Sequence, residues 1–242
     1  MGRAVAESVA AEGARVAVIG RTTTALESTV AALVELGSPD AVGLRADLTH
    51  ADDVETAFDE LRERWGEVNA LVNAAGPTEV GIKAFEALDE EEWLATFDIG
   101  TLSAVRCVRS ALPLLRNAEW ARIVNISAHS TRRQSPSLVA YTASKAAMTS
   151  VGKNLAQSLA PEGILINTVS PGSFLSEAMR AYLESLPVER GVDPDSLTDA
   201  MRVIEEDFGH PAFLPRAGDP KEIGPLIHVG GWSANTTPSD GS

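Results

Sequence analysis

A tyrosine and a lysine lie one helical turn apart near the middle of the chain. Tyr141 and Lys145 belong to the segment YTASK, and positions i and i+4 share one face of a helix. A free phenol has a pKa of about 10, which is too high for a proton acceptor at neutral pH. A nearby ammonium would stabilise the phenolate and lower that pKa. The pair therefore predicts a proton donor or acceptor for a carbonyl or alcohol oxygen.

The elements that must position this pair alternate between short apolar runs and amphipathic helical patterns. Strands are expected at 15–20, 41–48, 68–76, 121–127 and 164–172, and helices at 3–12, 22–36, 52–65, 89–116 and 138–159. This order predicts a parallel sheet with helices on both faces, and such sheets bind ligands beyond the carboxyl ends of their strands. Taken alone, the pair favours the alternative of a half-buried tyrosine beside a solvated lysine, and only the other motifs of the chain reverse that preference.

Four segments that follow strands resemble the motifs of the short-chain dehydrogenase/reductase family. They are ADL at 46–48, NAAG at 73–76, YTASK at 141–145 and NTVSPG at 167–172. The resemblance covers nearly the whole chain and implies a Rossmann-type α/β fold, a doubly wound parallel sheet in three α/β/α layers, as a single domain over residues 1–232. It also implies an NAD(P)-dependent oxidoreductase that transfers a hydride between nicotinamide and a carbonyl or secondary alcohol.

The resemblance assigns roles to individual residues. Tyr141 is the expected catalytic acid or base, and Lys145 is expected to hold the nicotinamide ribose while tuning the phenol. The positions expected to bind the cofactor are Gly2, Arg21, Asp47, Leu48, Asn73, Ala74, Gly76, Tyr141, Lys145, Pro171, Gly172 and Ser176. Members that prefer NAD usually carry an acid where this chain has Gly20. The next residue is Arg21, and a guanidinium suits a 2′-phosphate. NADP(H) is therefore favoured, with NAD(H) as the alternative.

Two positions depart from the family pattern at the expected catalytic centre. The position of the family's catalytic serine is Ala128, so Ser127 is expected to replace it, with Ser130 as the other candidate. His129 could also donate a hydrogen bond to a substrate oxygen. The position of the family's helix asparagine is Gly100, which has no amide and leaves room for a water molecule or for close packing. These changes support a second hypothesis, a non-catalytic relative that binds a ligand or partner without turnover.

Two segments of the family template are missing. Gly2 matches only the last glycine of the family's first glycine-rich loop, so the first, central strand and most of that loop are absent. The segment 222–227 runs directly into HVGGW at 228–232, without the family's full terminal helix and strand. The fold is therefore expected to be incomplete at the N-terminus and near the C-terminus, with unpaired backbone groups in the middle of the sheet and weak cofactor binding.

The C-terminal third has a different character. Residues 177–216 are polar and proline-containing, and we expect them to form a helical lid over the ligand cleft. The apolar residues within and beside this lid would suit a hydrophobic substrate or would form a small core of the lid itself. Residues 233–242 are predicted to be a polar tail.

Composition narrows the partners. The net charge of −14 argues against nucleic acid as a partner. The single cysteine, Cys107, excludes an internal disulfide and a cysteine-based zinc site, and no metal site is expected. The chain contains neither a long apolar run nor a signal peptide, so we expect no membrane partner and a cytoplasmic location. The expected partners are a small carbonyl or alcohol substrate and, by resemblance, further copies of the chain in a homodimer or homotetramer.

Overall fold

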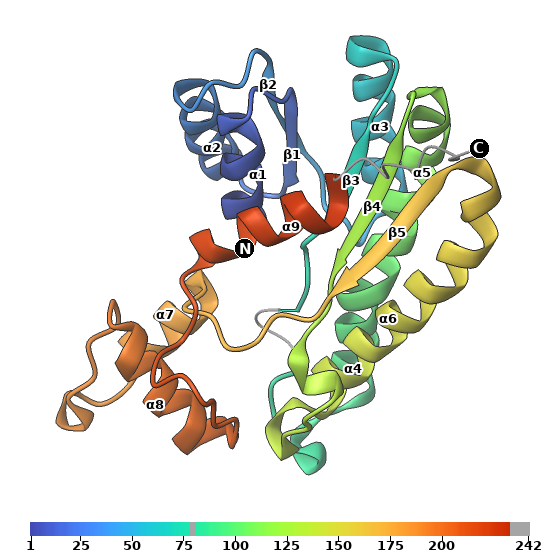
Figure 1. The fold of residues 1–242 in the computed structure, drawn as a ribbon. Helices are drawn as coiled ribbons and strands as arrows, with labels where there is room; N and C mark the ends of the chain where they lie inside the picture. Colours follow the sequence, from blue (N-terminus) through green and yellow to red (C-terminus); the bar gives the residue numbers. More distant parts are fainter. Residues whose placement is uncertain (78–80, 233–242) are drawn as a thin grey trace, which may run out of the picture.

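The five predicted strands are present and are all paired in parallel. The computed structural model describes residues 1–77 and 81–232. The strands are β1 (Val16–Gly20), β2 (Ala41–Arg45), β3 (Ala70–Asn73), β4 (Ala121–Ile126) and β5 (Ile164–Val169). They form two separate sheets, β1-β2 and β3-β4-β5, which Figure 1 shows in blue and in teal to yellow.

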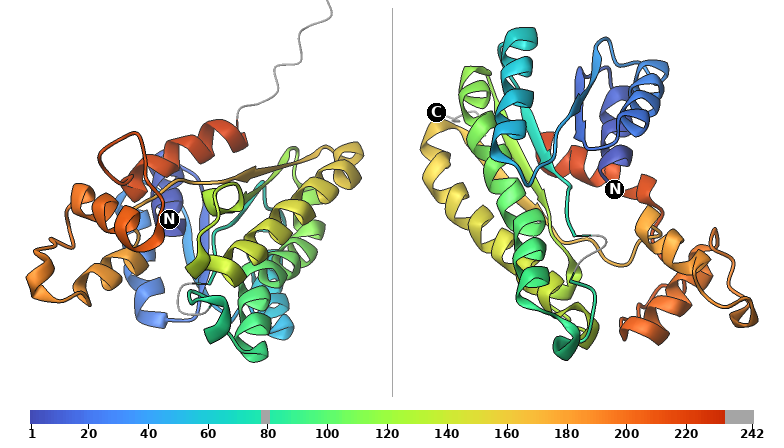
Figure 2. Two further views of the ribbon diagram at one scale, coloured as in Figure 1. Left: turned by 90° about the horizontal axis from the view of Figure 1, so that it is seen from below. Right: turned by 180° about the vertical axis from the view of Figure 1, so that it is seen from behind.

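Helices cover both faces of these sheets, as the three-layer prediction requires. They are α1 (Gly2–Ala11), α2 (Thr23–Glu35), α3 (Ala51–Trp65), α4 (Glu90–Phe97), α5 (Ser103–Asn117), α6 (Val139–Leu159), α7 (Glu177–Glu184), α8 (Leu197–Phe208) and α9 (Ile223–Trp232). Helices α3, α5 and α6 lie on one face, and α1, α2 and α9 on the other (Figures 1 and 2). The Rossmann-type α/β class is confirmed.

The main core lies between the sheets and the first of these helical layers. Phe58 of α3, Leu114 and Leu115 of α5, and Ile123 of β4 are fully buried there. The ends of α3 follow from the sequence. The helix begins with acidic residues, which favour the positive end of its dipole, and it ends at Gly66, which has a φ of 72°. This core anchors β4, the strand that leads to Tyr141.

The middle of the sheet is open, as the missing first strand predicts. Neither β1 nor β3 has a second strand partner among the residues that the structure describes. A cavity of about 1230 Å³ lies between them, lined by both strands and by α1. The side chains of β4 are all buried, whereas four of the five in β1 and three of the four in β3 are half-buried. The two strands that border the cavity are therefore less buried than β4.

The described part of the chain ends in a helix. Residues 223–232 form α9. α9 crosses the region between the two sheets and packs on α1, where a Cβ on Gly224 would overlap Ser8. The predicted tail, 233–242, lies outside the described residues.

The expected lid forms a small helical unit with its own core. Leu175, Leu183, Met201 and Ile204 are buried together, and Met179, Tyr182, Leu186 and Phe208 pack against them. The apolar side chains that could have served a hydrophobic substrate are therefore used mainly inside the lid. Phe174 is an exception, since it packs with the α1 and α9 layer.

The predicted helix 89–116 is divided by a π-helical turn, Asp98–Leu102. Gly100 lies in this turn, and a Cβ at that position would overlap the Ser144 hydroxyl of α6. The next residue, Thr101, donates through Oγ1 to the Ser144 carbonyl at 2.7 Å. Of the two explanations for Gly100, close packing is therefore the one that the structure supports.

Replacing Gly100 by alanine should lower the free energy of unfolding by about 1–3 kcal/mol, because the new methyl group must displace Ser144 in a packed helix contact. Thermal and denaturant unfolding of Gly100→Ala would measure the change. Gly172→Ala is the matched control, since a Cβ there meets no atom within 4 Å, and it should change stability by less than about 0.5 kcal/mol. Equal stability of both variants would show that the turn does not need a glycine.

Candidate active site

Tyr141 and Lys145 lie in the first turns of α6, beside the carboxyl ends of β3 and β4. Tyr141 is half-buried, and Lys145 is only 3% exposed. The Lys145 Nζ donates to the carbonyl of Ile126 at 2.9 Å and to that of Ala75 at 3.4 Å. A Cβ on Gly76 would lie 2.8 Å from the same nitrogen. The structure thus brings three separate segments of the predicted site together around one amine.

Burial dominates the protonation of this pair. It lowers the pKa of Lys145 to about 8 and raises the pKa of the Tyr141 phenol. The sequence predicts that Lys145 lowers the pKa of Tyr141, and in this structure the direction is the opposite. The physical reason is that the amine donates to backbone carbonyls and that desolvation of the phenol is the only influence on its pKa.

In the loop after β4, residues 127–130, the hydroxyls of both candidate serines already form hydrogen bonds within the protein. The Ser127 Oγ, 2% exposed, donates to the Lys145 carbonyl at 3.1 Å and shares a hydrogen bond with Thr149 Oγ1 at 2.8 Å. The Ser130 Oγ accepts from Thr142 Oγ1 at 3.0 Å. Both hydroxyls therefore join β4 and the following turn to α6, and Ala128 between them has no polar group. A substrate contact by Ser127 would require the loss of these bonds.

His129 and a histidine of the C-terminal third meet next to this loop. The rings of His129 and His210 are 4.6 Å apart in an edge-on arrangement, and Arg133 Nη1 donates to the Pro211 carbonyl at 3.1 Å. His210 is 3% exposed, and its Nε2 has no partner among the described residues. This contact fastens residues 210–211 to the loop after β4. The sequence analysis did not identify His210, because nothing local marks a contact across so many residues.

The expected adenosine-binding residues lie at the ends of β1 and β2. Asp47 Oδ1 accepts from the backbone N–H and the hydroxyl of Thr49, and these bonds lower the pKa of Asp47. Its Oδ2 has no partner in the described part of the chain. Arg21 is exposed at the end of β1, and its carbonyl accepts from the Arg45 Nε at 3.3 Å. Leu48 packs against the main core.

Most of the remaining residues expected to bind the cofactor make contacts within the protein, and one borders open space. Gly2 begins α1 against Ala74, and the Asn73 Nδ2 donates to Asn125 Oδ1 at 2.8 Å inside the sheet. Pro171 is buried and its carbonyl accepts from the His129 N–H, while Gly172 borders open space. Ser176 caps α7, since its Oγ accepts from the Met179 N–H at 3.2 Å.

A model of the short chain dehydrogenase family matches residues 1–186. The chain is 32% identical to "Uncharacterized oxidoreductase YvrD" of Bacillus subtilis over 85% of this chain and 76% of that protein. It is also 32% identical to a 3beta-hydroxysteroid dehydrogenase of Mediterraneibacter gnavus, over 80% and 71% of the two chains. The chain belongs to the short-chain dehydrogenase family.

Solved structures share the fold of this chain. An NAD⁺-bound xylitol dehydrogenase matches with a TM-score of 0.80 at 24% identity, over 94% of this chain and 86% of that one. An actinorhodin polyketide ketoreductase with NADPH matches with a TM-score of 0.80 at 25% identity, over 94% and 84%. The chain is by class an NAD(P)-dependent oxidoreductase, and none of these proteins favours the alternative of a non-catalytic relative.

The residues at the nicotinamide end fit a nicotinamide cofactor. Glycine at position 76 makes room for the Lys145 side chain, because a Cβ there would lie 2.8 Å from the amine nitrogen, and Gly172 borders open space. At the phosphate end, the first turn of α1 is the only part of the expected loop in the described chain. Within the described residues no group of three His, Cys, Asp or Glu could hold a metal ion, and no helix there is long and apolar enough to cross a membrane.

Acid should destabilise the contact between His129 and His210. Burial lowers the pKa of both side chains below the ordinary 6.5, and the charge of Arg133 lowers both further. Hydrogen bonds with the backbone raise the pKa in part, at Pro171 for His129 and at Gln134 and Arg133 for His210. The unfolded chain then binds more protons than the folded one below about pH 6.5, so the free energy of unfolding should fall as the pH drops from 7 towards 5.

Denaturant unfolding at each pH would measure this slope. His210→Leu should flatten it, because one buried proton acceptor is removed, whatever its effect on stability at pH 7. His50→Gln is the control, since His50 is exposed, and it should keep the slope of the unmodified protein. A slope unchanged by His210→Leu would contradict the assignment.

Proposed function

We propose that this chain interconverts a small-molecule carbonyl and the corresponding secondary alcohol, with Tyr141 as the proton donor and acceptor. The observation that carries the proposal is the meeting of Lys145 and Gly76 at the carboxyl ends of β3 and β4, with Tyr141 one helical turn before the lysine on α6. When bound, the nicotinamide supplies or accepts the hydride. The protein's own part is to hold the ligand, exclude water and exchange one proton at the phenol oxygen.

The protonation states suit reduction. Burial raises the pKa of Tyr141, so the phenol is neutral at pH 7 and carries the proton that a reduced carbonyl oxygen needs. Lys145, with a pKa of about 8, is mainly charged at pH 7 and would donate to a ribose hydroxyl. Ser127 is the proposed replacement for the family serine, with Ser130 as the other candidate.

Arg21 is the proposed selector for NADP(H). It is exposed at the end of β1, and the Arg45 guanidinium lies beside its carbonyl, so two cations share the corner where a 2′-phosphate would bind. Asp47 would accept from the adenine amino group through its free Oδ2. The solved relatives include one with NADPH and one with NAD⁺, so the choice rests on Arg21.

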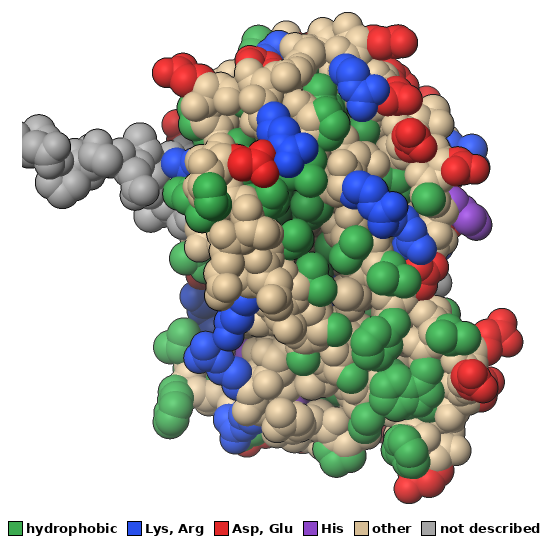
Figure 3. All heavy atoms as spheres, turned by 90° about the vertical axis from the view of Figure 1, so that its right-hand side faces the viewer, with side chains coloured by type: hydrophobic (Ala, Val, Ile, Leu, Met, Phe, Trp, Pro, Cys, Tyr) green, Lys and Arg blue, Asp and Glu red, His purple; other side chains and the backbone are tan. Residues whose placement is uncertain are grey.

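Self-association is proposed through α5 and α6. Leu94, 65% exposed, and Leu102, 46% exposed, lie on α4 and the π-helical turn that adjoin these helices. Figure 3 views the molecule from the side on which α5 and α6 lie in Figure 1, and hydrophobic side chains gather there. A homodimer or homotetramer would cover them. The cytoplasmic location stays a prediction.

Tyr141→Phe should reduce carbonyl-reducing activity at least about 100-fold, the usual size of a lost acid–base contribution, and leave NADPH affinity nearly unchanged. Activity on a panel of ketones and NADPH fluorescence titration would measure the two effects. Tyr182→Phe is the matched control, because Tyr182 is the other tyrosine of the chain and its hydroxyl donates to Asp207 in the lid. Equal activity of both variants would remove Tyr141 from the mechanism.

Arg21→Ala should weaken NADPH binding about tenfold or more while changing NADH binding little, because a charge-assisted hydrogen bond to the 2′-phosphate is worth roughly 1.5–3 kcal/mol. Fluorescence titration with each coenzyme measures the ratio. Arg109→Ala serves as the control, since Arg109 is exposed on α5. The same loss for NADH and NADPH would contradict a phosphate contact.

A further inference from the structure

The segment that follows β2, residues 47–50 and called the β2 turn below, is ordered mainly by its own residues. Asp47 Oδ1 accepts from the backbone N–H of Thr49 at 2.9 Å and from its hydroxyl at 2.7 Å. The Asp47 N–H donates to Asp53 Oδ2 in the first turn of α3 at 3.0 Å. These bonds fix the shape of the β2 turn, but none of them fixes its position relative to α6.

One hydrogen bond joins the β2 turn to a distant helix. Arg106 of α5 donates through Nη1 to the Leu48 carbonyl at 3.1 Å, across 58 positions of the sequence. Among the described residues it is the only hydrogen bond between the β2 turn and any element other than α3. Cys107 and Val108 anchor α5 in the main core, on which the Leu48 side chain also packs. Arg106 therefore ties the β2 turn to a fixed element.

The same guanidinium contacts the π-helical turn that packs on α6. The Arg106 Nη2 donates to Asp98 Oδ1 at 2.6 Å, and the two side chains are partly buried, 20% and 29% exposed. Asp98 begins the π-helical turn, whose Thr101 donates to the Ser144 carbonyl of α6. Because a guanidinium is planar and its donors have a fixed spacing, Arg106 links the β2 turn rigidly to the segment beside the helix of the candidate catalytic pair.

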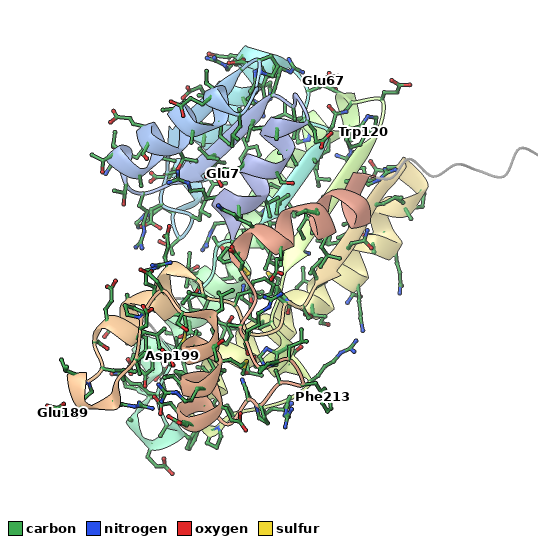
Figure 4. The ribbon with its side chains drawn as sticks, turned by 60° about the vertical axis from the view of Figure 1, so that its left-hand side comes forward. Glu7, Glu67, Trp120, Glu189, Asp199 and Phe213 are labelled. Carbon is green, nitrogen blue, oxygen red and sulfur yellow. The ribbon has the colours of Figure 1, made fainter. Side chains whose placement is uncertain are left out.

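Other polar contacts hold the amino ends of the strands together. Arg15, just before β1, forms an ion pair of 3.6 Å with Glu67, just before β3. Asp40, just before β2, accepts from Trp65 Nε1 at 2.7 Å. Figure 4 shows Glu67 at the end of the molecule that is remote from the lid. Arg106 supplies the corresponding contact at the carboxyl ends, the side of such sheets on which ligands bind.

We propose that Arg106 is a positioning residue for the coenzyme, because it fixes the distance between Asp47 and Lys145. The inference rests on the proposed function, in which one coenzyme reaches from the free Oδ2 of Asp47 to the Lys145 amine. A ligand that contacts both groups binds more tightly when the β2 turn is held in place beforehand, since less conformational freedom is then lost. Without Arg106 the β2 turn keeps its internal bonds but moves relative to α5, and the adenosine half of the coenzyme binds more weakly.

The first measurement needs no ligand and uses the variant Arg106→Met, which keeps the apolar stem and removes both donors. Amide hydrogen exchange of the isotope-labelled full chain should become about tenfold faster at Asp47 and Thr49, because the β2 turn opens more readily when it loses a charge-assisted hydrogen bond. Exchange at Ala46, whose N–H donates to the Gly20 carbonyl, should stay the same, which shows that the β1-β2 sheet is intact.

The second measurement divides the coenzyme into two fragments. Adenosine 2′,5′-bisphosphate probes the β2 turn, and reduced nicotinamide mononucleotide probes the end of the site beside Lys145. In calorimetric titrations Arg106→Met should bind the first about tenfold more weakly and the second as the unmodified chain does. Arg109→Met is the matched control, since Arg109 is exposed on the same helix, and it should change neither affinity. A merely structural loss would weaken both fragments alike.

Three results would overturn the inference. The first is equal exchange at Asp47 and Thr49 in Arg106→Met and Arg109→Met. The second is an equal loss of affinity for the two fragments in Arg106→Met, and the third is full affinity of that variant for adenosine 2′,5′-bisphosphate. Failure of the unmodified chain to bind either fragment would instead count against the proposed function, and the exchange measurement would still decide whether Arg106 holds the β2 turn.

Discussion

An interior strand of a parallel sheet needs hydrogen-bond partners on both edges, and this chain meets that requirement only in part. β4 has β3 and β5 as neighbours, and all its side chains are buried. β1 and β3 each have one neighbour. What keeps the two sheets in one molecule is therefore side-chain and helix packing. Arg64 and Trp65 of α3 bind Asp40 before β2, and α1 packs on α9 through Val5, Ile223 and Ile227.

The candidate site is also divided between the two sheets. The groups that would handle the substrate and the nicotinamide lie on the complete half, around β4, β5 and α6. The groups that would hold the phosphates and the adenosine lie across the opening, on α1, β1 and β2. Acid–base chemistry and coenzyme affinity thus depend on different parts of the fold. A change that closes the opening should act on affinity first, because the geometry around Tyr141 is already fixed by buried packing.

The sequence predicted what depends on local pattern. Strand and helix periodicity located all five strands, and post-strand motifs located the residues around Lys145. What could not be read locally were contacts between distant segments: the engagement of Ser127 with Thr149, the use of Met179 and Phe208 inside the lid, and the meeting of His129 with His210. Each of these contacts depends on the tertiary arrangement of distant segments, which the periodicity of the sequence does not encode.

The pKa of Tyr141 shows most clearly that the position of a residue does not by itself determine its protonation. Spacing on a helix put the amine on the right face, but the effect of an ammonium on a phenol depends on where its N–H groups point. An ammonium has three donors, and two of those on Lys145 are used by Ile126 and Ala75. The third has no partner in the described part of the chain. It is the one through which Lys145 can act on a ligand hydroxyl or on the phenol, and Gly76 allows the amine to lie where it does, since a Cβ at that position would overlap it.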